Sequence, residues 1–79
     1  MQPFKPSIHR MYFIDKQVRG KTYPSSVSLA ADYQEKHGIS VNPRTIAADI
    51  AAMKEKYRAP LSYDYQKRGY FYTNPNFPC

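Results

Sequence analysis

The sequence predicts a mainly α domain in which three helices are followed by a small β-hairpin. Three successive segments carry apolar residues at helical spacing, and residues typical of helix boundaries flank each of them. The period then changes to two, because apolar and polar residues alternate over residues 61–66, and the aromatic stretch of residues 70–73 follows. The chain has 79 residues, which is enough for one small core and too short for two.

The first helix is expected to begin after Ser7, a suitable N-cap, and to stop at Gly20. Tyr12 and Phe13 widen its apolar surface, so we expect this helix to be covered on more than one side. Its main apolar stripe is predicted to consist of Ile8, Met11, Ile14 and Val18.

The second helix has a cap at Ser25 or Ser26 and a C-terminal Gly38. Its buried stripe is predicted to be Leu29, Ala30 and Tyr33. The following stretch, residues 39–41, is too short for an element. We expect it to form a turn whose two apolar side chains, Ile39 and Val41, hold it against the core.

The third helix is predicted over about Asn42–Arg58, with Pro60 ending it. Asn42 is a preferred N-cap, and proline at the first helical position loses no hydrogen bond. Alanines occupy much of the surface outside the apolar stripe, which favours a smooth helix. The stripe itself is predicted to be Ile46, Ile50, Met53 and Tyr57.

Two short aromatic strands follow, joined by residues 66–69, in which Gly69 is free to adopt a positive φ. Half of the eight tyrosines lie here, and core and rim packing explains them better than a stacking platform for single-stranded nucleic acid. These four are Tyr63, Tyr65, Tyr70 and Tyr72. Two helices joined by a short turn and followed by a hairpin predict a three-helix winged helix-turn-helix.

The charge balance points to an acidic partner. Twelve Lys and Arg residues against six Asp and Glu residues leave a net charge of +6, which favours nucleic acid first and an anionic membrane surface second. No apolar run approaches the roughly 20 residues that a transmembrane helix needs. The N-terminus also lacks the apolar segment of a signal peptide, so we expect a cytoplasmic protein.

Catalytic and metal chemistry has no support in the sequence. The only cysteine is Cys79, which excludes an internal disulfide, and together with His9 and His37 it forms no closely spaced ligand pair. No nucleophile and base can be assembled from these residues, and the three glycines form no phosphate-binding loop. We therefore expect no enzyme activity, no cofactor and no metal.

Several stretches of the chain resemble one known family. These stretches are Ile39-Ser40-Val41-Asn42-Pro43-Arg44-Thr45-Ile46, Asp49-Ile50, Pro60-Leu61-Ser62-Tyr63-Asp64 and Gly69-Tyr70-Phe71-Tyr72. They are similar to the N-terminal domain of WYL-type bacterial transcriptional regulators, part of the type 11 and DeoR-like helix-turn-helix group. The resemblance covers about residues 7–73. It implies sequence-specific binding to double-stranded DNA, usually as a homodimer and usually ahead of a ligand-sensing domain.

The resemblance also suggests a domain organisation. Residues 1–6 would form an extended tail, residues 7–73 the DNA-binding domain, and residues 74–79 a tail or a linker to a further domain through which a dimer would form. Two positions depart from the family pattern. Asn42 replaces a frequent serine, which preserves the cap, and Ala48 replaces an arginine, which removes a common DNA contact.

Candidates for reading bases lie in the first turns of the third helix, the part of a recognition helix that reaches base edges. Arg44 is suited to guanine and Thr45 to the thymine methyl group, whereas a solvent-facing arginine and a capping threonine are the alternatives. Asp49 is expected to be structural and to pair with a basic residue of the second helix or the hairpin. The base-reading candidates are Asn42, Pro43, Arg44, Thr45, Ala47 and Ala48.

Candidates for binding phosphates lie at the second helix, the turn, the third helix and the hairpin. Capping explains the serines equally well, and Lys54 also suits the negative end of its helix. Lys67 and Arg68 either contact phosphates or keep an edge strand soluble. The full set is Ser25, Ser26, Ser28, Ser40, Lys54, Lys67 and Arg68.

Two other functions remain open. The alanine-rich third helix could dock a protein, and the missing arginine at Ala48 is the best argument for that reading. The chain could also be the regulatory N-terminal domain of a larger enzyme such as a biotin ligase. Between Arg44 and Arg68 the net charge is only +3, which predicts modest DNA affinity that a second subunit would reinforce.

Overall fold

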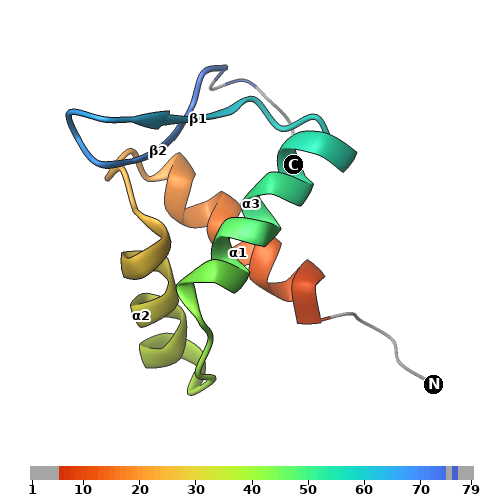
Figure 1. Cartoon of the computed structure of the whole chain (residues 1–79), viewed down its shortest axis with the longest axis vertical. Coiled ribbons are helices and arrows are strands. Elements are labelled where there is room, and N and C mark those ends of the chain that lie inside the picture. The colour runs from red at the N-terminus through yellow and green to blue at the C-terminus, as the bar shows by residue number, and fades with distance from the viewer. Residues whose placement is uncertain (1–5, 75, 77–79) are drawn as a thin grey trace.

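A computed structural model describes residues 6–74 and 76 of the chain. Within this part the chain forms three helices followed by a two-stranded hairpin (Figure 1). The helices are α1 (Pro6–Arg19), α2 (Ser26–His37) and α3 (Pro43–Lys56), and the strands are β1 (Leu61–Asp64) and β2 (Gly69–Tyr72). This confirms the predicted fold class, mainly α with a winged helix-turn-helix arrangement. Residues 1–5, 75 and 77–79, most of the two predicted tails, lie outside the described residues.

α1 ends at Arg19, which confirms the predicted stop at Gly20, but its start and its left-handed residue differ from the prediction. The helix begins at Pro6, so Ser7 lies inside the first turn and is not the N-cap. Proline is well tolerated at this first position because its missing N–H would have no helical partner. At the other end the left-handed residue is Lys21, with φ of 60°, and its N–H donates to the carbonyl oxygen of Val18 at 3.1 Å. The chain therefore turns one residue after Gly20.

The caps of α2 and α3 confirm the sequence signals. The backbone N–H of Ser28 donates to the Ser25 hydroxyl, and the N–H of Ser25 donates to the Ser28 hydroxyl, which forms a capping box. Gly38 closes α2 with φ of 68°. The Asn42 side chain accepts a hydrogen bond from the N–H of Arg44 at 2.8 Å, and Pro43 is the first residue of α3. Residues 38–42 thus form the turn of the helix-turn-helix.

The core lies where the three helices meet, and each helix contributes one fully buried aliphatic side chain, Ile14, Leu29 and Ile46. The predicted stripe of α2 is buried, as are three of the four residues predicted for α3. Met11, Val41, Tyr70 and Tyr72 pack partly against this centre. The remaining core residues are Phe13, Val18, Ala30, Tyr33, Ile50, Met53, Ala59 and Leu61.

Some apolar residues predicted to be covered are exposed instead. Ile8 and Tyr12 lie one turn apart on a side of α1 that faces solvent, so α1 is not covered all round. Tyr57 follows the last residue of α3, and the chain leaves the helix there, so its ring is 54% exposed. Ile39 is also half exposed, and Val41 alone packs the turn against the core.

The hairpin pairs β1 with β2 in antiparallel register, with Leu61 opposite Tyr72 and Asp64 opposite Gly69. Residues 65–68 form the connection, and the Asp64 carboxylate accepts hydrogen bonds from the N–H groups of Gln66 and Lys67, both at 2.9 Å. Asp64 therefore stabilises the hairpin turn through its side chain.

The predicted role of Gly69 is wrong. The left-handed residue is Arg68, with φ of 57°, and Gly69 has no positive φ. Gly69 instead permits close contact with the loop between α1 and α2, since an added Cβ would lie 1.7 Å from the carbonyl oxygen of Tyr23. The next N–H, that of Tyr70, donates to the carbonyl oxygen of Pro24 at 2.8 Å. β2 is thus joined to this loop through its backbone.

The hairpin tyrosines divide into two groups. Tyr70 and Tyr72 pack against the core, and Tyr63 meets Tyr70 edge to face at 5.0 Å between ring centroids. Tyr65 is 84% exposed, and its ring meets that of Tyr63 edge to face with centroids 5.0 Å apart. Core and rim packing therefore accounts for Tyr63, Tyr70 and Tyr72, while Tyr65 projects into solvent.

Candidate nucleic-acid interface

One face of α3 is exposed along its whole length. The face opposite carries the buried residues Ile46, Ile50 and Met53, so the helix is amphipathic in the way the sequence predicted. Small side chains make up its middle, with one cation toward each end. The residues of this exposed face are Arg44, Ala47, Ala48, Ala51, Lys54 and Glu55, so one carboxylate lies next to Lys54 at its end.

The base-reading candidates are not equally accessible. Arg44, Ala47 and Ala48 are exposed, whereas Pro43 and Thr45 are half-buried at the start of α3. Asn42 is exposed too, but its side-chain oxygen already accepts the hydrogen bond that caps the helix. Ala47 and Ala48 both lie about one turn after Arg44 on the same face, and Ala51 extends that face by another turn. Helical spacing could have identified Ala51 from the sequence.

Asp49 lies outside this face because it is buried and paired with Arg10 of α1. The guanidinium donates Nε to Oδ2 of Asp49 at 2.5 Å and Nη2 to Oδ1 at 3.2 Å. The prediction of a structural aspartate is confirmed, but the predicted partner on α2 or the hairpin is wrong. α3 packs across α1 in Figure 1, and this crossing brings the two side chains together. No local sequence signal indicates such a pairing.

The same pair determines the charge of Arg10. The hydrogen bond to Asp49 is the main cause that raises the pKa of Arg10 above its ordinary value. Burial opposes this shift, and the Coulombic attraction to Asp49 adds a smaller contribution that raises the pKa. Arg10 therefore stays protonated throughout the physiological pH range. Its charge and that of Asp49 neutralise each other inside the protein, so the carboxylate does not oppose an anionic ligand at the exposed face of α3.

Two of the three serine candidates at α2, Ser25 and Ser28, are occupied by capping, whereas the half-buried Ser26 takes no part in the capping box. Both hydroxyls of the capping box, those of Ser25 and Ser28, are engaged in hydrogen bonds with the first turn. Among the described residues, however, the N–H groups of Ser26 and Val27 have no hydrogen-bond partner. Ser40 is exposed in the turn before α3. The amides at the start of α2, and not the capping hydroxyls, are therefore the groups available to a phosphate.

Lys67 and Arg68 are both exposed in the hairpin connection, but their surroundings differ. The Lys67 ammonium lies 4.6 Å from the ring centroid of Tyr23, in cation–π geometry. Arg68 makes no such contact in the described part of the chain and projects from a left-handed backbone. Arg68 is therefore the more accessible of the two cations for an external phosphate.

No family model, curated protein or solved structure matches the chain. The winged-helix arrangement is accordingly shown by the order and packing of the helices and the hairpin, and the resemblance to WYL-type regulators stays a prediction. Within residues 6–74 and 76, no three His, Cys, Asp or Glu side chains are grouped to hold a metal ion. No helix in that part of the chain is both long and apolar enough to cross a membrane.

Proposed function

We propose that this chain binds double-stranded DNA, with α3 in the major groove. The exposed face of α3 carries the proposal: Ala47, Ala48 and Ala51 allow close approach, while Arg44 and Lys54 supply positive charge. A groove about 12 Å wide admits one helix, and small side chains let the helix backbone come near the base edges. The burial of Asp49 favours the proposal as well, because it leaves Glu55 as the one carboxylate on the exposed face of α3.

Phosphate contacts from other elements would set the register on the duplex. The free amides at the start of α2, the exposed Ser40 and the hairpin cations Lys67 and Arg68 are suited to this role. We propose that the domain serves a bacterial transcriptional regulator, as the resemblance to WYL-type proteins implies. A homodimer would then double the contact surface.

Selection from a random duplex pool tests the proposal directly. The chain is incubated at low salt with random duplexes, bound molecules are sequenced, and the enriched duplex is titrated against a scrambled one. We expect an enriched motif and an affinity that falls steeply with salt. A protein complex that is insensitive to salt, with no enrichment of any duplex, would contradict the proposal and support the protein-docking alternative.

The Arg44→Ala variant is expected to weaken binding to the selected duplex by about 1–3 kcal/mol and to relax one base position. Arg44 is exposed at the start of α3, and its side chain makes no hydrogen bond within the described residues. Loss of the side chain should therefore leave the fold intact, and thermal unfolding serves as the check. Unchanged selectivity at every position would exclude Arg44 as a base-reading residue.

The Arg68→Ala variant is expected to weaken binding to all duplexes alike. Loss of one phosphate contact should reduce the slope of log affinity against log salt by about one unit. Alanine and arginine face a similar steric cost at the left-handed backbone of residue 68, so stability should change little. A matched control is Lys36→Gln, which removes one positive charge near the C-terminus of α2; an equal slope change in this control would argue against a specific wing contact.

A further inference from the structure

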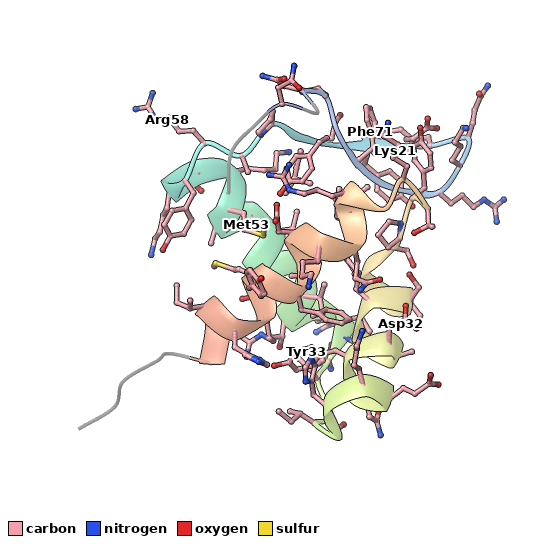
Figure 2. All side chains as sticks on the ribbon, turned by 180° about the vertical axis from the view of Figure 1, so that it is seen from behind. Lys21, Asp32, Tyr33, Met53, Arg58 and Phe71 are labelled. Carbon is pink, nitrogen blue, oxygen red and sulfur yellow. The ribbon has the colours of Figure 1, made fainter. Side chains whose placement is uncertain are left out.

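A cavity of about 580 Å³ opens beside the hairpin, on the side of the molecule where α1 lies. Its walls come from the end of α1, the loop to α2, and β2. Figure 2 shows Lys21 and Phe71 close together at this place, on the opposite side of the view from Arg58, with α3 behind α1. A volume of this size is typical of small-molecule sites. The lining residues are Val18, Arg19, Lys21, Tyr23, Phe71 and Tyr72.

Aromatic rings make up much of the lining. The rings of Tyr23 and Phe71 are tilted by 45° with centroids 5.9 Å apart, and both side chains are only half-buried. Tyr72 is held by a hydrogen bond from its hydroxyl to Asp15, and the Arg19 guanidinium lies 4.9 Å from the centroid of its ring. A planar ligand entering the cavity would therefore meet aromatic surfaces that the fold already holds in place.

Positive charge surrounds these rings. Arg19 is neutralised by the buried Asp15, to which its Nε donates at 3.0 and 3.1 Å. Lys21 and Lys67 form no ion pair in the part of the chain that the structure describes. Lys21 lines the cavity, and the Lys67 ammonium is held over the Tyr23 ring. Two uncompensated cations thus lie beside the aromatic lining.

The backbone of Tyr23 at the cavity is strained, and the residues packed against it hold it in that conformation. Tyr23 has φ of 55°, a left-handed value that is rare for a bulky residue and costs on the order of 1–3 kcal/mol. Its carbonyl packs against Gly69, which leaves the backbone no room to relax toward β2. The ring is consequently fixed between Phe71 and Lys67. Such strain at a concave, charged surface is characteristic of ligand sites.

We propose that this cavity binds a small aromatic anion, a planar ring that carries a carboxylate or a phosphate. The ring would lie against Tyr23 and Phe71, and the anionic group would be bound by Lys21 and Lys67. The site lies away from the exposed face of α3 and shares only Lys67 with the proposed phosphate contacts, so ligand binding is tested in the absence of DNA. An aromatic carboxylate and a nucleotide share this chemistry, and experiment distinguishes them.

NMR titration of the chain in the absence of DNA tests the site. The probes are 1-naphthoate and adenosine 5′-monophosphate, with 1-naphthylmethanol and adenosine as neutral counterparts and inorganic phosphate as the anion alone. We expect saturable shifts at Lys21, Tyr23 and Phe71 with at least one anionic probe, and affinity about tenfold lower for its neutral counterpart. Whichever anionic probe binds more tightly identifies the class of ligand.

Variants separate binding from folding. Lys21→Gln is expected to weaken the tighter probe about tenfold, because a charge-assisted hydrogen bond is lost. Tyr23→Leu, which removes the ring, should have a similar effect, and Lys36→Gln should have none. If Tyr23→Leu fails to fold, Lys21→Gln still tests the site, since Lys21 is exposed. The proposal is overturned if no probe saturates, if neutral or ring-free probes bind equally well, or if Lys21→Gln binds normally.

Discussion

Replacing Asp49 with alanine is expected to lower the free energy of unfolding by about 3 kcal/mol, a large part of the stability of a domain this small. The carboxylate side chain is 7% exposed and accepts two hydrogen bonds from Arg10, whose side chain is only 18% exposed. Without Asp49 the guanidinium keeps its charge in a largely buried position with no counter-ion. Removing one partner of such a buried pair lowers the stability of the protein by more than the intact pair contributes to it.

Urea unfolding followed by circular dichroism measures this effect, and a double variant provides the control. Arg10→Met combined with Asp49→Leu replaces both charged groups with apolar side chains, and we expect it to recover most of the loss. Asp49→Asn keeps the shape of the side chain but removes its charge. Its free energy of unfolding should therefore lie between those of Asp49→Ala and the double variant. If the double variant loses as much free energy of unfolding as its two single substitutions lose together, the two residues act independently.

Replacing Gly69 with alanine is expected to destabilise the protein by about 3 kcal/mol. The new Cβ would lie 1.7 Å from the oxygen and 2.2 Å from the carbonyl carbon of Tyr23, so backbone must move. That movement would disturb the neighbouring hydrogen bond from Tyr70 to Pro24, which joins β2 to the loop. We therefore expect the hairpin to detach from α1 and α2 before the helices unfold.

The other two glycines are matched controls for this substitution. Gly38→Ala meets no neighbouring atom, but φ of 68° makes alanine less favourable by about 1 kcal/mol. Gly20→Ala has no positive φ and its Cβ would lie 3.2 Å from the Gln17 oxygen, so the change should be about 0.5 kcal/mol or less. Midpoints of thermal unfolding should rank the variants in this order. Equal midpoints for Gly69→Ala and Gly20→Ala would contradict the close packing.

The local elements could be predicted from the sequence because their signals act within one helical turn. Ser25 with Ser28, Gly38 and Asn42 define the helix ends through hydrogen bonds or backbone preferences that involve near neighbours. The stripes of α2 and α3 likewise follow from a spacing of three and four residues. The exposed face with Arg44, Ala47 and Ala48 is the complement of the α3 stripe, so most of the candidate DNA interface was predictable as well.

Contacts between elements could not be predicted, since they depend on how the helices cross. Arg10 and Asp49 are 39 residues apart and meet only because α1 packs across α3. Gly69 was expected to supply a turn, yet its missing side chain serves the packing of β2 against Tyr23. Exposure at Ile8 and Tyr12 also follows from packing, because three helices leave part of α1 without a neighbour.

By itself the sequence determined the three helices, the hairpin, the caps and the amphipathic face of α3, because hydrogen bonds and side-chain periodicity within a few residues specify them. Only the tertiary structure decided that Asp49 and Arg10, 39 residues apart, neutralise each other, whereas Asp15 and Arg19 are four residues apart within α1. Burial of Asp49 against Arg10 and of Asp15 against Arg19 removes two carboxylates from the surface. Exposed cations therefore remain on α3, on the hairpin and at the aromatic cavity, among other places, because burial beside an opposite charge cancels a charge that exposure to solvent would leave available.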